Sequence, residues 1–122
     1  MRITILDSRV PSFGPVDGAC LRALEPAYVD PGGGIASVRT GIAIDVQSAT
    51  TVGLIFVDKS LADVASFGGS VPAIEAGATG EIVLQVRNES NTEPLLINPG
   101  TVLGRIRYVQ VDSPQVELAV GY

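Results

Sequence analysis

The chain has 122 residues, of which 46% are hydrophobic and 17% charged, and its formal net charge is −5 at pH 7. A chain of this length buries one core, so we expect a single domain over residues 1–122. The acidic balance excludes the broad cationic surface that nucleic-acid binding requires. No signal-peptide pattern and no bilayer-spanning apolar stretch occur, so we expect a soluble, non-exported protein without a membrane partner.

The side chains available for chemistry are few. The chain has no His, which removes the commonest general base and the commonest metal ligand. Cys20 is the single cysteine, so an intramolecular disulfide is excluded, and without a His partner we expect a small buried residue rather than a nucleophile. Any hydrolysis would depend on carboxylates, and we expect neither a metal ion nor a cofactor.

The first strand signal lies in residues 2–6, where apolar and polar side chains alternate. Pro11, Gly14 and Pro15 then interrupt regular pairing. Residues 1–15 therefore form either an extended N-terminal arm that lies across a neighbouring subunit or an edge strand of their own domain, and the sequence leaves both alternatives open.

Two longer strand signals follow. Residues 35–46 show a two-residue period that Gly41 interrupts, as a bulge or a close backbone approach would. Residues 50–60 form a nearly continuous apolar run, which is typical of a strand buried on both faces, and residues 61–66 are compatible with one short helical turn.

The second half of the chain repeats short strands between turns. Pro99 and Gly100 predict a type II turn, because Pro presets φ and Gly tolerates a positive φ. Residues 112–122 form a C-terminal tail. Short strands at this spacing indicate an all-β sandwich or barrel. The remaining strand signals lie in residues 81–88, 94–100 and 101–111.

Six short segments follow one another in a recognisable order: ILDSR (5–9), LRALEP (21–26), VRTGIAIDV (38–46), KS (59–60), GEIVLQVRN (80–88) and INPGTVLGRI (97–106). This order resembles the trimeric dUTPase family, and the resemblance extends from about Ile5 to Val111. It implies a jelly-roll β-barrel and a homotrimer whose active sites are each built from several subunits.

The family's phosphate-binding motifs are altered at the matching positions. The resemblance places Cys20 where the family has an Asp that supports metal-bound phosphates, and a thiol is no substitute because Mg²⁺ prefers hard oxygen ligands. Lys59 and Ser60 stand in the second motif, where Lys lacks the bidentate fork of Arg. Asp58, beside them, would repel a phosphate. The fourth motif, at residues 100–105, keeps neither of its charged residues.

The third motif is altered as well. Glu75 takes the place of the family's water-activating Asp, and its longer side chain displaces the carboxylate by about an ångström. Ala78 takes the place of the Tyr ring that lies against the deoxyribose. Gly80, Glu81 and Asn88 match the family but serve equally well as scaffold residues. We therefore treat Cys20, Lys59, Ser60, Glu75 and Ala78 as relic positions without a catalytic role.

These observations favour a non-catalytic structural protein: a trimeric decoration (cement) protein on a virion capsid, assembled in the host cytoplasm, with the major capsid protein as its partner. That assignment is an analogy at the level of the family. The alternative is a divergent dUTPase-like nucleotide diphosphohydrolase or nucleotide-binding regulator. A third hypothesis, an inactive trimer that acts as an inhibitor or adaptor, has the same sequence features.

Two segments are expected to contact the partner. Apolar side chains of the N-terminal segment are hard to bury within one small domain, and those of the tail alternate as one face of a strand that could extend a neighbour's sheet. The expected contact residues are Ile3, Ile5, Val10, Phe13, Val116, Leu118, Val120 and Tyr122. The aromatic residues Tyr28, Phe56, Phe67 and Tyr108 are expected to fill the core instead.

Overall fold

The computed structural model describes residues 1–68, 72–111 and 117–122. Within them the chain is built from β-strands and one 3₁₀ turn, η1 (Val10–Phe13), and no helix is long and apolar enough to cross a membrane. The all-β prediction is confirmed. The strands are β1 (Arg2–Ile5), β2 (Cys20–Arg22), β3 (Ala27–Val29), β4 (Ile35–Arg39), β5 (Ile42–Asp45), β6 (Thr51–Val57), β7 (Ala65–Phe67), β8 (Ala73–Ile74), β9 (Val83–Asn88), β10 (Leu95–Ile97) and β11 (Val102–Gln110).

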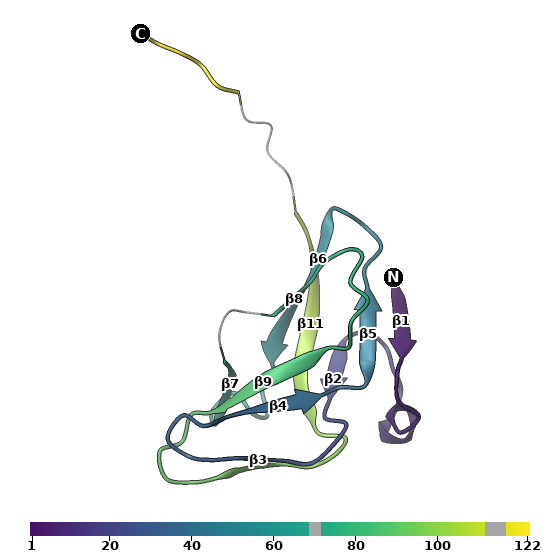
Figure 1. Ribbon diagram of the computed structural model, residues 1–122, viewed down its shortest axis with the longest axis vertical. Coiled ribbons are helices and arrows are strands. Elements are labelled where there is room, and N and C mark those ends of the chain that lie inside the picture. Colours follow the sequence, from purple (N-terminus) through teal and green to yellow (C-terminus); the bar gives the residue numbers. More distant parts are fainter. Residues whose placement is uncertain (69–71, 112–116) are drawn as a thin grey trace.

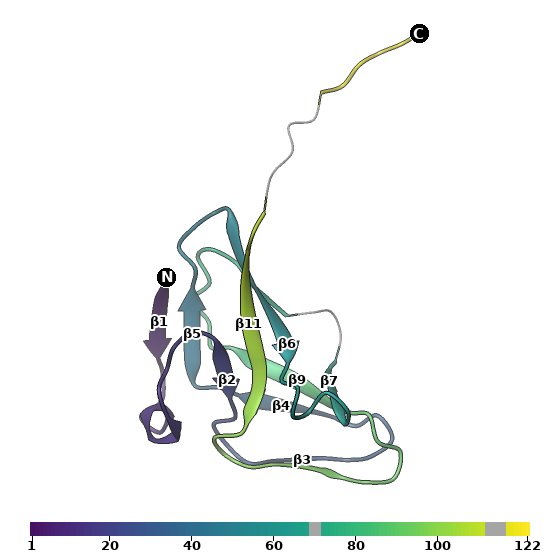
Figure 2. The same cartoon turned by 180° about the vertical axis from the view of Figure 1, so that it is seen from behind.

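The strands pair in antiparallel sheets that surround one core, as a jelly-roll arrangement requires (Figure 1). The larger sheet has the order β2-β11-β6-β8, and a second sheet has the order β4-β9-β7. Two ribbons, β1-β5 and β10-β3, complete the described pairing. Seen from behind, β11 runs the length of the body between β2 and β6 (Figure 2).

The core is formed by side chains that point inward from the strands. In β9 every second residue is buried, so that Leu84, Val86 and Asn88 point inward. Opposite them lie buried aliphatic side chains from the other strands, among them Leu21 and Ile44. In β9 this two-residue period is the one expected from the sequence, because one face lies on the core and the other in solvent. In β5 the alternation is lost, since Ile42, Ala43 and Ile44 are all buried.

Residues 2–5 adopt the edge-strand alternative. Strand β1 pairs with β5, with Arg2 opposite Asp45 and Ile5 opposite Ile42. Ile5 is exposed, Ile3 and Phe13 are half-buried against the core, and Val10 is buried. Val10 is thus buried within the protomer, and the contact roles of Ile3, Ile5, Val10 and Phe13 stay predictions.

Gly41, which separates β4 from β5, leaves the space into which the Val10 side chain packs. Gly41 has φ of 72°, and a Cβ built there would lie 2.7 Å from Cγ2 of Val10. The backbone N–H of Leu6 donates to the Gly41 carbonyl over 2.8 Å. The predicted close approach is confirmed: the gap between β4 and β5 is the place where the N-terminal segment packs.

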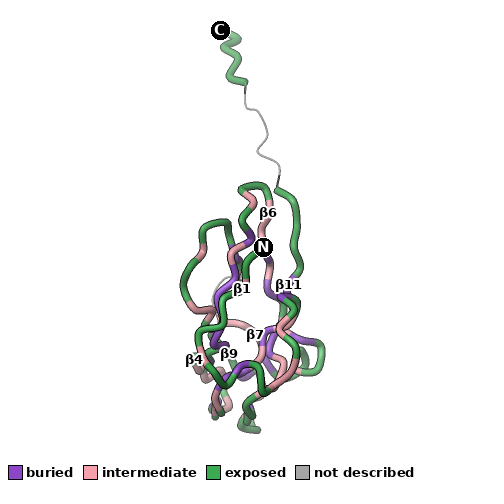
Figure 3. The backbone as a smooth tube through the Cα atoms, turned by 90° about the vertical axis from the view of Figure 1, so that its right-hand side faces the viewer, coloured by how far each residue is buried: buried purple, intermediate pink, exposed green. Residues whose placement is uncertain are grey.

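The C-terminal end lies apart from the body (Figure 3). Leu118 is 90% exposed, and Val120 and Tyr122 are also exposed. Val116, the fourth apolar residue of the predicted contact face, lies outside the described residues. The partner role of this tail stays a prediction.

The expected turn at Pro99 is present, and of the four aromatic residues expected in the core Phe67 packs against it, half-buried. Gly100 has φ of 85°, and the Thr101 N–H donates to the Asn98 carbonyl. Tyr28 is 59% exposed and Phe56 is 45% exposed, so the prediction that they fill the core is wrong. Aliphatic side chains fill it instead, and Tyr28 stands on the outer face of the β3-β10 ribbon, opposite Leu96.

We expect the substitution Asn88→Ala to reduce the free energy of unfolding by about 3 kcal/mol. Asn88 is 1% exposed, and its side-chain amide donates to the carbonyls of Val29 and Glu93 while its oxygen accepts the Ser90 N–H. Urea denaturation would measure the loss, with the exposed Asn91→Ala as control. Equal midpoints for the two variants would contradict this role.

Candidate functional site

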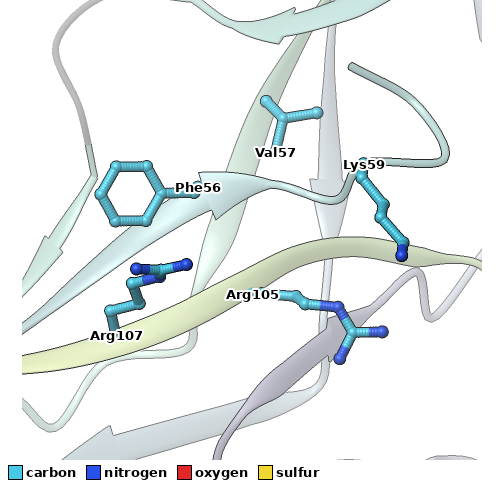
Figure 4. Close-up of a pocket in the computed structure, with 5 residues that line it drawn as sticks. All are labelled: Phe56, Val57, Lys59, Arg105 and Arg107. Atoms are coloured by element: carbon cyan, nitrogen blue, oxygen red, sulfur yellow. The ribbon is translucent and has the colours of Figure 1, made fainter.

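A cationic groove lies on the outer face of the larger sheet, where β6 ends beside β11. Its volume is about 620 Å³ (Figure 4). The alternation of β11 produces it: Ile106 points into the core, so Arg105 and Arg107 point outward. Arg105 stands opposite Phe56 in the register. The lining residues are Phe56, Val57, Lys59, Arg105 and Arg107. Of these, sequence reasoning identified Lys59 alone as a candidate site residue.

Asp58 compensates one of these charges. Its carboxylate is buried and accepts hydrogen bonds from Nε of Arg105 at 2.7 Å and from the Ser60 hydroxyl at 2.5 Å. The Ser60 hydrogen bond and then Arg105 hold the pKa of Asp58 below its usual value. Asp58 is thus engaged by Arg105 and is not among the residues that line the groove, and its expected repulsion of phosphate stays a prediction.

Cys20 is the cross-strand neighbour of Arg105 in the β2-β11 pair. Nη1 of Arg105 donates to its sulfur over 3.1 Å, and the side chain is half-buried. The guanidinium is thus fixed from two sides, by Asp58 and by Cys20. Within the described residues, neither Lys59 nor Arg107 has a carboxylate at ion-pair distance. The groove therefore carries excess positive charge in an acidic protein.

The loop after β8 forms a second candidate region. The Ala78 N–H donates to the Glu75 carbonyl, and the Gly77 N–H donates to Oδ1 of Asp45 over 2.9 Å. The same oxygen accepts the Gln47 N–H over 3.0 Å. These two backbone hydrogen bonds lower the pKa of Asp45. Asp45 thus anchors the loop that carries Glu75.

Two cavities flank this loop and meet at Ala78, which lines both. The larger has a volume of about 280 Å³ and is lined mostly by aliphatic residues, among them Ile44, Ile55 and Ile74, but also by the carboxylate residue Glu81. The smaller has a volume of about 120 Å³ and polar walls that include Asp45. Glu75 is exposed beside them, and no hydrogen bond or ion pair engages its carboxylate within the described residues.

The groove and the loop lie at opposite ends of β6. Ile74 pairs with Gly53, so Glu75 is level with the start of that strand, whereas Lys59 follows its end. At 3.3 Å per residue, Glu75 and Lys59 are about 20 Å apart, whereas Arg107, opposite Leu54, is closer to the level of Glu75. The predicted positions therefore form two groups: Cys20, Lys59 and Ser60 at the groove, and Glu75 and Ala78 at the loop.

The residues present do not fit a magnesium site. No group of three or more His, Cys, Asp or Glu side chains capable of holding a metal ion occurs in the described part of the chain. Cys20 faces a guanidinium instead of contributing an oxygen ligand, and Mg²⁺ requires oxygen donors. We therefore derive no step through a protein-bound metal ion.

Comparison with solved structures identifies the fold. A mutant dUTPase from phage phi11 of S. aureus matches with a TM-score of 0.78 and 14% identity, over 99% of this chain and 97% of that one. The dUTPase of Staphylococcus bacteriophage 80alpha with dUpNHpp matches with a TM-score of 0.77 and 13% identity, over 99% and 88%. The chain has a dUTPase-like fold. No protein-family model and no curated protein sequence matches it.

This finding corrects the expectation that the protein is not an enzyme. The structures that share its fold across nearly the whole chain are described as dUTPases, and one of them holds the nucleotide analogue dUpNHpp. At 13–14% identity the likeness shows the fold. The activity of this chain has to be argued from its own residues.

We expect Asp58→Asn to lower the free energy of unfolding by about 1–3 kcal/mol at pH 7, because Arg105 loses a charged acceptor. The folded pKa of Asp58 lies below 3.8, so the stabilisation is complete above that pH and disappears as the pH falls through the folded pKa. Urea denaturation of wild type and variant at pH 7 and at decreasing acid pH would measure it. A difference that stays constant into strong acid, or an equal loss in the exposed Asp63→Asn control, would contradict the assignment.

Proposed function

We propose that this protein is a divergent dUTPase-like nucleotide diphosphohydrolase that works as a homotrimer. The observation that carries the proposal is the meeting of an aliphatic and a polar cavity at Ala78, next to the exposed carboxylate of Glu75. A nucleoside has the same two parts, a flat and largely apolar base and a hydroxylated sugar. Pockets that combine apolar walls with a few polar groups are typical ligand sites.

The nucleobase is assigned to the larger cavity. Its volume of about 280 Å³ and its aliphatic walls suit a flat ring. The segments 72–74 and 80–84 form two of its sides, so backbone groups as well as side chains face the ligand. In this arrangement Ala78 leaves the passage between base and sugar open.

The phosphates are assigned to the cationic groove. Lys59, Arg105 and Arg107 supply three positive charges, of which Asp58 compensates one. Arg side chains bind phosphate oxygens through paired N–H groups. Asp58 and Cys20 hold the Arg105 guanidinium in place, so little side-chain freedom is lost when an anion binds. The charge that develops on a leaving diphosphate is stabilised by such fixed cations.

Within one protomer the cations lie at different distances from Glu75. Glu75 and Lys59 are about 20 Å apart along β6, whereas Arg107 is nearer, because it stands opposite Leu54, whose other neighbour is Ala73. We assign the groove of one protomer to the nucleoside bound on the loop of another. Closed rings of identical subunits repeat such a contact at every interface.

The reaction follows from this assignment. Glu75 accepts a proton from a water molecule whose oxygen forms a bond to the α-phosphorus. The bond between that phosphorus and the oxygen bridging to the β-phosphorus breaks, and diphosphate leaves toward Arg105 and Arg107. The products are a nucleoside monophosphate and diphosphate. Because Glu75 is exposed and no hydrogen bond of the described residues fixes its carboxylate, we expect slow turnover.

The earlier expectations of a virion capsid location and of a major capsid protein partner stay predictions. The groove and the two cavities provide no test of the expected capsid location or of the expected capsid protein partner. If the protein binds a nucleotide without hydrolysing it, the result would favour a nucleotide-binding regulator instead of an enzyme.

We expect purified protein to release diphosphate from nucleoside triphosphates, and Glu75→Gln and Arg107→Ala each to reduce turnover by about 100-fold. A diphosphate-release assay over the common nucleoside and deoxynucleoside triphosphates, with and without Mg²⁺, would measure this. The matched controls Glu93→Gln and Arg87→Ala change exposed charges away from both regions. No turnover with any of these nucleotides, despite a folded oligomer, would refute the enzymatic proposal.

Mixing the two inactive variants tests the shared site. If Glu75 and Arg107 act from different copies, refolding Glu75→Gln together with Arg107→Ala should restore about one quarter of wild-type turnover, since that share of sites combines two intact halves. Light scattering would give the oligomer mass. Absence of any recovery in mixed oligomers of two inactive variants would place both groups in one protomer and refute the shared site.

A further inference from the structure

The smaller cavity beside the loop has the chemistry of a sugar site. It is lined by Arg2, Thr4, Ala43, Asp45, Ala78 and Thr79. These residues come from three segments: β1, the end of β5 and the loop after β8. The pairing of Arg2 with Asp45 across β1 and β5 places a guanidinium and a carboxylate at the same end of the ribbon. The cavity thus offers a charged acceptor, charged donors and two hydroxyl groups.

Asp45 is held in one orientation. Its Oδ1 accepts the N–H groups of Gln47 and Gly77, at 3.0 Å and 2.9 Å. Within the described residues, Oδ2 accepts no hydrogen bond, and the side chain is half-buried. A carboxylate fixed through one oxygen presents the other as an oriented acceptor for a hydroxyl group, and hydrogen bonds to charged acceptors are stronger than neutral ones.

The size of the cavity limits what enters it. A volume of about 120 Å³ corresponds to roughly four water molecules of the liquid. That is enough for a furanose ring with its hydroxyl groups and too little for a base as well. Because Ala78 also borders the aliphatic cavity, a sugar seated here is adjacent to a base seated there.

We propose that this cavity binds the ribose of a ribonucleotide, with Oδ2 of Asp45 accepting the 2′-hydroxyl proton, so that the protein prefers ribonucleotides to deoxyribonucleotides. The inference rests on the proposed function and specifies its substrate class. Carboxylates that accept a ribose hydroxyl in this way are known from dinucleotide-binding folds. Ala78 contributes by leaving the room that a larger side chain would fill.

The experiment measures the dissociation constants of α,β-imido UTP and α,β-imido dUTP by titration calorimetry, and repeats the comparison with the corresponding adenine pair. We expect the ribose form to bind about tenfold more tightly for at least one base. Equal affinities, or tighter binding of the deoxyribose forms, would overturn this inference while leaving the proposed function intact. If no analogue binds, the proposed function fails and this inference fails with it.

Two variants test whether Asp45 and Ala78 cause the preference for ribonucleotides. In Asp45→Asn the amide oxygen still accepts the N–H groups of Gly77 and Gln47. The amide nitrogen takes the place of Oδ2, so a donor replaces the oriented acceptor. The ratio of the dissociation constants of the deoxyribose and ribose forms should therefore fall to about one, with the affinity for the deoxyribose form nearly unchanged. A preference that persists in this variant would overturn the role of Asp45.

Ala78→Phe is the second variant, and it should reverse the preference because the ring fills the space next to the 2′ position. The control Asp30→Asn changes an exposed carboxylate elsewhere and should keep the wild-type ratio. Circular dichroism would verify that every variant is folded. An unchanged ratio in a folded Ala78→Phe protein would overturn the assignment of the cavity.

Discussion

The pairing of β6 with β11 is the constraint on which the rest of the structure depends. The register joins seven residues of each strand, from Gly104 opposite Val57 to Gln110 opposite Thr51. In a strand with a two-residue period, this register fixes the side of every residue at once. It turns Ile106 into the core and the two arginines beside it into the groove. A shift by one residue would bury both charges.

The same pairing explains how an acidic chain maintains a cationic groove. The cost of burying Asp58 is offset because Arg105 and Ser60 satisfy its oxygens. The carboxylate in turn fixes the guanidinium, while Lys59 and Arg107 remain available to an anion.

The sequence predicted the strands well and the site only in part. The alternation in residues 83–88 depends on local burial, so it was visible in the chain. The expected alternation did not extend to β5, where Ile42, Ala43 and Ile44 are all buried. The role of Asp45 was not visible, because its partner Gly77 is 32 residues away. Arg105 and Arg107 were missed because residues 100–105 were compared with a motif and Arg107 lies beyond it; only their place on the outer face of β11 brings them together. Tyr28 was misplaced because a two-stranded ribbon has too little cover to bury both of its faces.

The edge position of β1 has a practical consequence for handling this protein. Its pairing with β5 brings Arg2 to the wall of the small polar cavity, so any residues fused ahead of Met1 would emerge beside that cavity and crowd its entrance. The opposite end differs, since Tyr122 lies in a fully exposed segment apart from the body. Affinity tags and surface attachment are therefore better tolerated at the carboxyl end, whereas a fluorophore at the amino end would sit close enough to report on what enters the cavity.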